Sequence, residues 1–160
     1  MEEQTVKHLV VIASFVIVSW TDTVHSQDEA TKTTIGTEDI LAREIEKGAP
    51  TQSIGFEGWN RGVIPLDAYF DAMKGNVLRV REIVLQPDAI IAAHGHDRTP
   101  AVIYVIQGEL IEHRSDREEP VIRRQGDIYF ATRGVVHWSE NISPKPTRVL
   151  VVDILTTNPE

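Results

Sequence analysis

The stretch HGHDRTPAVIYVIQG, residues 94–108, joins two closely spaced histidines to a continuous apolar segment that ends at a glycine. Side chains i and i+2 of an extended chain point to the same face, so His94 and His96 would aim their rings at a common point. A second segment containing glycines, much later in the chain, offers a third ring, His137. Neutral imidazole is a common ligand for divalent metals, and the sequence has no cysteine. The three histidines therefore predict a nitrogen-ligated metal site.

Strand signals continue from residue 76 almost to the C-terminus, as short apolar or alternating segments separated by turn residues. The expected strands cover residues 77–85, 89–93, 101–107, 109–114, 121–124, 127–131, 136–140 and 148–155. The continuously apolar segment 101–107 is expected in the interior of a sheet. Short strands at this spacing are typical of an all-β sandwich or barrel.

The residues before this region have a different texture. A helix is expected over residues 37–47, with Thr37 as its N-cap and with Gly48 and Pro50 ending it. Residues 51–75 contain four glycines and scattered aromatic side chains without a convincing period. We expect loops and short irregular pieces there.

An apolar run, LVVIASFVIVSW at residues 9–20, resembles the core of a secretory signal peptide. It is shorter than the roughly 20 residues that span a membrane, and Ser26 offers a small residue at a cleavage site. The expected product is exported, to the periplasm or as a secreted protein. Glu2 and Glu3 make the start of the chain less basic than usual, which leaves an uncleaved N-terminal membrane anchor as the alternative. The expected division is a signal peptide at 1–26, an N-terminal extension at 27–75 and a barrel at 76–157.

The two histidine segments resemble the motifs of the cupin superfamily, G-x5-H-x-H-x(3,4)-E-x6-G and G-x5-P-x-G-x2-H-x3-N. The residues that fall at the motif spacing are His94, His96 and Gly108 in the first and Gly126, Gly134, His137 and Asn141 in the second. The resemblance covers about residues 76–155. It implies a double-stranded β-helix barrel of the cupin or jelly-roll type, here with a short N-terminal helix, and His94, His96 and His137 as metal ligands.

Three positions depart from the motifs. Asp88 stands in place of the first glycine and Thr132 in place of the proline, and both lie in expected turns. Ala101 occupies the place of the glutamate ligand. Three neutral imidazoles would leave a divalent ion with two net positive charges, which makes it a stronger Lewis acid than a site with a carboxylate ligand. Such a site should favour an anionic chelating ligand. Fe(II) is the favoured metal, with Zn, Mn, Ni and Cu as alternatives.

Similar three-histidine cupins include thiol and diketone dioxygenases, so the resemblance favours a metal-dependent, dioxygenase-like oxidoreductase that acts on a small organic anion. Arg98 and Tyr104 are the candidate substrate-binding residues, through a two-pronged carboxylate contact and a phenol respectively. Whether the protein is an enzyme stays open at this point. The alternatives are a non-catalytic binding or sensing cupin in which a metal helps to capture the ligand, and a metal-free structural cupin.

The net charge of the chain is -8 at pH 7, which argues against nucleic acid as a partner. A homodimer is expected because cupins commonly dimerise through sheet edges. Residues 77–85 or the N-terminal helix are the candidates for covering an exposed edge.

Overall fold

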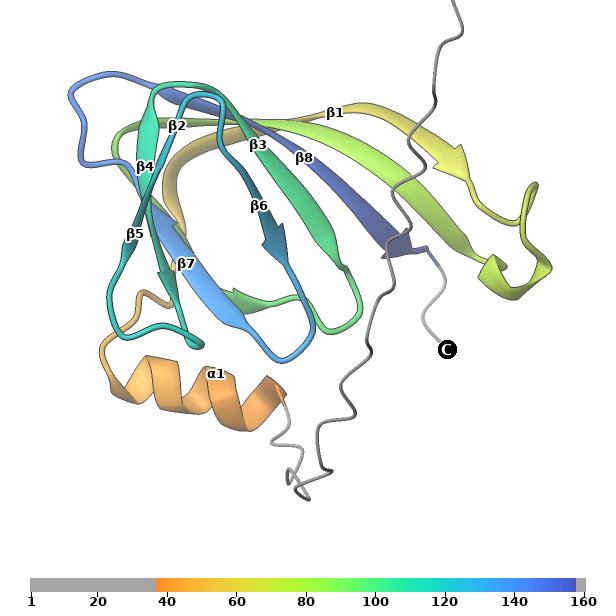
Figure 1. The fold of residues 1–160 in the computed structure, drawn as a ribbon, viewed down its shortest axis with the longest axis horizontal. Helices are drawn as coiled ribbons and strands as arrows, with labels where there is room; N and C mark the ends of the chain where they lie inside the picture. The colour runs from red at the N-terminus through yellow and green to blue at the C-terminus, as the bar shows by residue number, and fades with distance from the viewer. Residues whose placement is uncertain (1–36, 158–160) are drawn as a thin grey trace, which may run out of the picture. The chain divides into compact units, whose positions relative to one another are not determined.

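The computed structural model describes residues 37–157, so the expected leader at residues 1–26 lies outside the described residues. Helix α1 (Thr37–Glu46) comes first and agrees with the expected helix to within a residue. Figure 1 shows the strands that follow, curled into a jelly-roll sheet, which confirms the predicted all-β fold class. They are β1 (Ile54–Pro65), β2 (Asn76–Gly95), β3 (Ala101–Gln107), β4 (Glu109–Arg114), β5 (Val121–Arg124), β6 (Ile128–Ala131), β7 (Val136–Glu140) and β8 (Thr147–Thr156), with the 3-10 helix η1 (Asp71–Met73) between β1 and β2. Over residues 37–157, no helix combines the length and apolarity needed to cross a membrane.

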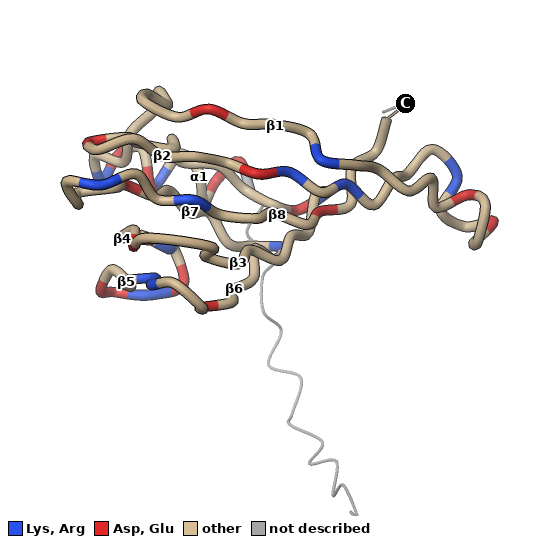
Figure 2. Tube along the Cα trace, turned by 90° about the horizontal axis from the view of Figure 1, so that it is seen from above, with Lys and Arg blue, Asp and Glu red and all other residues tan. Residues whose placement is uncertain are grey.

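The strands pair in the order β5-β4-β7-β2-β8-β3-β6, and β1 adds to β2. All of these pairings are antiparallel. Figure 2 shows how the sheet curls, with β1 on one side of the barrel and the terminal strands β5 and β6 on the other. The inner face of the curl holds the hydrophobic core, which includes Leu85, Val105 and Val149.

Strand β2 organises the barrel because it changes partner along its length. Its first half, residues 76–85, pairs with β8, and its last residues, 90–95, pair with β7. The change occurs around Asp88, whose φ of 63° lies in the left-handed region. A glycine at this motif position would adopt that conformation without strain, whereas Asp tolerates it at some cost. The two strands expected at 77–85 and 89–93 are therefore one long strand bent at Asp88.

The expectation of loops over residues 51–75 is wrong for β1, which runs antiparallel along the edge of β2 for most of its length. Every residue of β1 is exposed. A strand without a buried face needs no alternation of apolar and polar residues, so the period that reveals a half-buried strand is missing from its sequence. The glycines of this segment therefore gave a misleading signal.

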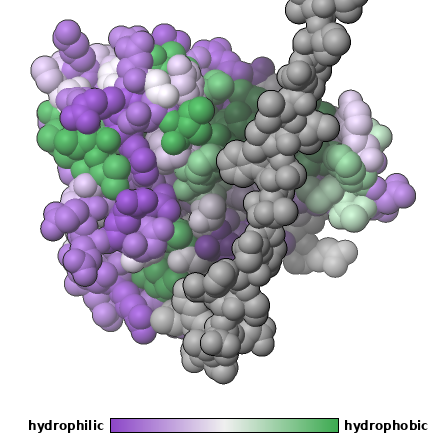
Figure 3. Space-filling view, viewed as in Figure 1, coloured by the Kyte–Doolittle hydropathy of each residue, from purple (hydrophilic) through white to green (hydrophobic). Residues whose placement is uncertain are grey.

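Strand β3 also differs from the expectation drawn from its apolar sequence. It lies between β8 and β6, inside the sheet as predicted, but only one of its faces is buried. Val102 and Tyr104 point outwards and are each 40% exposed, beside the exposed Ile128 and Phe130 of β6. Figure 3 shows apolar surface among the polar residues on this side of the described part. The continuous apolar sequence thus serves a core on one face and an apolar outer surface on the other.

Candidate metal centre

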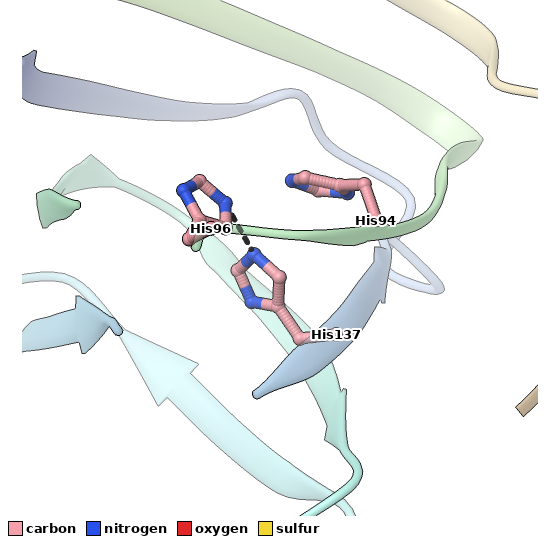
Figure 4. A group of neighbouring side chains, drawn as sticks. All are labelled: His94, His96 and His137. Carbon is pink, nitrogen blue, oxygen red and sulfur yellow. Dashed lines mark hydrogen bonds between the residues drawn. The ribbon is translucent and has the colours of Figure 1, made fainter. Parts of the chain in front are cut away.

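Three imidazole rings converge inside the barrel (Figure 4). His94 lies near the end of β2 and is the direct cross-strand partner of His137 on β7, while His96 follows immediately after β2. The ring centroids lie 4.6 Å apart for His94 and His137, 4.9 Å for His94 and His96, and 5.0 Å for His96 and His137. The structure therefore brings together the three histidines that the sequence singled out, from segments far apart in the chain.

Each ring is held from behind through its Nδ1 atom. His94 Nδ1 lies 2.7 Å from the carbonyl oxygen of Ala92, and His96 Nδ1 lies 2.7 Å from that of Thr99. His137 Nδ1 lies 2.9 Å from a carboxylate oxygen of Glu112. Since all three partners are acceptors, Nδ1 carries the proton in each neutral ring and Nε2 keeps its lone pair.

The Nε2 atoms of His96 and His137 face each other at 3.1 Å. Two lone pairs at this distance repel unless a cation lies between them. Two nitrogen ligands about 2.1 Å from one metal ion, at an angle of about 95°, would be separated by about 3.1 Å. All three histidines offer a ligand atom within 4.8 Å of one another. This donor set fits a divalent metal ion, and the acceptors behind the rings are of the kind that orient metal-bound histidines.

Glu112 on β4 is fully buried beneath His137. Its carboxylate accepts hydrogen bonds from Nε and Nη2 of Arg123, at 2.8 and 2.7 Å, and from Nη1 of Arg114 at 3.1 Å. Burial acts to raise the pKa of Glu112, but the hydrogen bonds from His137 and Arg123 outweigh it and hold the pKa below its ordinary value. Glu112 is therefore ionised, and it fixes both the orientation and the proton position of His137.

The environment keeps the metal-facing histidines neutral. Burial, followed by the charge of His137, lowers the pKa of His94 to about 4. Burial also lowers the pKa of His96. Both rings consequently offer a free Nε2 lone pair at neutral pH, which is the form that binds a metal.

No carboxylate takes the place of the missing motif glutamate among the described residues that could hold the ion. Ala101 is buried on β3 and pairs with Asp153 on β8. The Asp153 carboxylate is held by Arg79, through Nε at 2.9 Å and Nη2 at 2.8 Å, and by Nη2 of Arg81 at 2.8 Å. Asp153 is thus engaged by guanidinium groups, and the candidate ligand set consists of three histidines.

The histidines open into a cavity of about 290 Å³. Its wall is mostly apolar, and includes Ile83, Leu85, Ile91, Ile103, Val149 and Val151. The polar groups that face it are the histidines, Arg81, Tyr129 and two serines, Ser53 and Ser139. None of the described lining residues is an Asp or a Glu. The cavity is therefore an apolar pocket with a positive end.

The structure does not bring Arg98 or Tyr104 to this cavity. Arg98 is exposed in the turn after His96, and Tyr104 points to the outer face of β3. Neither belongs to the residues that line the cavity. Their contact with a substrate stays a prediction, which the geometry does not support.

Two residues of the candidate site were not predicted from the sequence, Arg81 and Glu112. In each case the signal was the alternation of the strand. Arg81 shares the inner face of β2 with Ile83 and Leu85, and Glu112 shares the inner face of β4 with Leu110. A charged residue at a strand position that alternation assigns to the core face was the clue that could have identified each of them.

The barrel is similar to known proteins both in sequence and in fold. Residues 81–153 match the family model described as a Cupin domain. A comparison with curated protein sequences found no match. Among solved structures, a predicted oxalate decarboxylase from Thermotoga maritima matches with a TM-score of 0.50 and 20% identity, over 68% of this chain and 95% of that chain. The polyketide cyclase RemF from Streptomyces resistomycificus matches with a TM-score of 0.50 and 15% identity, over 68% of this chain and 75% of that chain. Residues 81–153 thus match a cupin domain, here without the motif glutamate, and the two solved structures show a likeness of fold.

Proposed function

We propose that this protein is a metal-dependent enzyme that acts on a small organic anion, with His94, His96 and His137 as the metal ligands. One observation carries the proposal: each ring has its Nδ1 atom fixed by an acceptor, while Nε2 lone pairs meet at a distance suited to a shared metal ion. We propose Fe(II) as the metal, because a ferrous ion with three imidazoles leaves positions for both a chelating anion and dioxygen.

A bound Fe(II) would supply Lewis acidity and one-electron chemistry with dioxygen. The chain's own residues would prepare the site for it. The three neutral rings leave the charge of the ion uncompensated, which favours an anionic ligand. Glu112 strengthens His137 as a metal ligand by accepting a hydrogen bond from its Nδ1–H group. The apolar wall excludes water from the ligand, and none of the described lining residues has a carboxylate that would compete for the cation.

A second candidate function is a non-catalytic cupin in which the metal helps to bind or sense an anion. The specific observation in its favour is the shortage of proton acceptors in the cavity. Apart from the three histidines, Tyr129 and Arg81 are the titratable residues among the described lining residues. Burial raises the pKa of the Tyr129 phenol above its ordinary value, so it stays protonated. An enzyme with this cavity would have to rely on the metal and its ligand for proton transfer.

Metal analysis tests both candidates at once. Protein purified without added metal should contain about one transition-metal ion per chain, and His94→Ala and His137→Ala should each lose it. His113→Ala is the matched control, because His113 stacks on Trp138 outside the cavity at 3.6 Å between ring centroids. It should keep the metal. Equal metal content in all three variants would refute the assignment of the ligands.

Oxygen uptake then separates the enzyme from the binding protein. The Fe(II)-loaded protein is incubated in air with a panel of small oxo and hydroxy acids. Uptake that depends on one acid supports the enzyme. Binding of an acid without oxygen uptake or product supports the non-catalytic alternative.

We also propose that the protein is exported and forms a homodimer. Export is supported by the apolar run at residues 9–20, and N-terminal sequencing of the protein from periplasmic and culture fractions tests it. The exposed apolar residues on β3 and β6 support the dimer. Light scattering tests it, and a monomer at micromolar concentration would contradict it.

A further inference from the structure

We propose that Arg81 anchors the carboxylate of the ligand in the histidine cavity, and that this ligand is a small monocarboxylate with an aliphatic body. The inference rests on the proposed function, in which the cavity takes an organic anion beside the metal. Its starting point is that Arg81 lines the cavity and that its Nε atom is buried without a hydrogen-bond partner in the described part of the chain.

The surroundings of Arg81 explain why this donor is free. Arg79, two residues earlier on the same face of β2, holds both carboxylate oxygens of Asp153 through Nε and Nη2. Arg81 reaches Asp153 with Nη2 alone. Two guanidinium groups therefore share one carboxylate, which leaves a net positive charge on the cluster. The Nε donor of Arg81 is not used for Asp153, and it is the buried donor that is left without a partner in the described part of the chain.

The charge of the cavity selects an anion for this donor. Arg81 is the one formally charged side chain among the described lining residues if the histidines are neutral, and no lining Asp or Glu competes for it. A buried cationic donor without a partner is unfavourable, and a carboxylate oxygen would satisfy it with a charge-assisted hydrogen bond. Arg81 is thus prepared to bind an acid rather than a neutral molecule.

The remaining wall defines the rest of the ligand. It is built mainly from Ile, Leu and Val side chains, which cannot hydrogen-bond to the body of a ligand, and Ser53, Ser139 and Tyr129 are its few uncharged polar groups besides the histidines. The volume of about 290 Å³ is at the lower end for ligand pockets, which begin at about 300 Å³. A short aliphatic acid fits these limits. An oxygen donor next to its carboxylate, as in a 2-oxo or 2-hydroxy acid, would allow it to reach the metal as well.

The experiment compares 4-methyl-2-oxopentanoate with its uncharged amide by titration calorimetry. Both are titrated into the wild-type protein, Arg81→Gln and Arg79→Gln, each in metal-free and Zn²⁺-loaded form. Arg79→Gln is the matched control, because it removes the other partner of Asp153 and Arg79 does not line the cavity. We expect Arg81→Gln to weaken binding of the acid by about 10-fold to 100-fold and to leave binding of the amide unchanged. Arg79→Gln should keep the preference for the acid.

Several results would overturn the anchor. Equal weakening by Arg81→Gln and Arg79→Gln would mean that Arg81 acts through Asp153 and not on the ligand. Unchanged acid binding by Arg81→Gln would refute it directly. If Arg81→Gln does not fold, the metal-free wild-type protein decides, because it must still prefer the acid over the amide.

Zn²⁺ stoichiometry, measured in the same titrations, separates this inference from the proposed function. If the wild-type protein binds Zn²⁺ but its preference for the acid does not depend on Arg81, the role of Arg81 as the anchor is refuted and the metal site stands. If the protein binds no metal but still prefers the acid through Arg81, the proposed metal-dependent function is refuted and the anchor stands.

Discussion

The substitution Glu112→Gln tests how the chain controls its metal ligands. It keeps the shape of the side chain and removes its charge. The amide oxygen can still accept from Nε and Nη2 of Arg123, which hold one carboxylate oxygen in the wild type. The amide NH2 group must then face His137 Nδ1 and Arg114 Nη1, where the wild type has an acceptor. His137 can avoid a contact between two donors by moving its proton from Nδ1 to Nε2.

This tautomer places a proton on the atom that should bind the metal. Loss of such an acceptor behind a histidine ligand lowers metal affinity by about 10-fold to 100-fold. The same change removes the charge partner of the Arg123 guanidinium, and this ion pair is mostly buried, because Glu112 is fully buried and the Arg123 side chain is 17% exposed. Breaking a buried ion pair costs about 3–5 kcal/mol of folding free energy. We therefore expect both weaker Zn²⁺ binding and a lower free energy of unfolding, and the second effect should persist without metal.

Titration calorimetry with Zn²⁺ gives the affinity, and urea denaturation of the metal-free protein gives the stability. The ¹⁵N chemical shifts of His137 report which ring nitrogen carries the proton. Glu109→Gln is the control, because Glu109 is exposed and its contact with Arg124 is 3.5 Å long, so its loss should cost less than about 1 kcal/mol. Wild-type zinc affinity in Glu112→Gln, with the proton still on Nδ1, would refute the role assigned to Glu112.

Three further predictions concern stability. The pKa of His94 falls from 6.5 to about 4 on folding, so the unfolded chain binds more protons than the folded chain between these pH values. The free energy of unfolding of the metal-free protein should therefore fall by up to about 3 kcal/mol as the pH drops from 7 to 4. Urea denaturation across this range checks the slope, and constant stability would contradict the buried neutral ring. Gly108→Ala should lower the free energy of unfolding by about 3 kcal/mol, because φ is +81° and the new Cβ would lie 2.7 Å from Thr147 Oγ1. Gly126→Ala should lower it by about 1–2 kcal/mol, because φ is +94° but the space around the new Cβ is open. Similar melting temperatures of the two variants would sink this ranking. Asn141→Ala should lower the free energy of unfolding by about 3 kcal/mol, because the buried amide donates to three backbone carbonyl oxygens and accepts two further hydrogen bonds. A decrease of less than about 1 kcal/mol in urea denaturation would disprove this role.

The parts of the fold that the sequence predicted correctly are those where a local pattern and a tertiary constraint coincide. Gly108, Gly126 and Gly134 all have positive φ, so the motif spacing reports turns that the barrel needs. The histidine pair is visible because its rings share a strand face. Strand β1 was missed because pairing with the edge of β2, and not burial, makes it a strand. Neither propensity nor period contains that information.

The site shows the same division between local and distant information. The ligands could be predicted because the motif fixes their spacing, but their supporting groups could not, because those come from other strands. Glu112 reaches His137 from β4, and Asp153, which shares its charge between Arg79 and Arg81, comes from β8. Such contacts depend on the cross-strand register, which the sequence does not state.

The substitution of the motif glutamate by Ala101 gains a physical meaning from this arrangement. A carboxylate ligand there would neutralise part of the metal charge and would compete with an incoming acid for the same cation. Among the described residues, the buried carboxylates Glu112 and Asp153 are both kept away from the open cavity: Glu112 acts on the rear of a ligand ring, and Asp153 is saturated by arginines. The negative charge that the centre needs must then arrive with the ligand. The same reasoning predicts that Ala101→Glu would strengthen Zn²⁺ binding and weaken binding of 4-methyl-2-oxopentanoate to the metal-loaded protein. Tighter binding of both would show that the cavity does not depend on charge in this way.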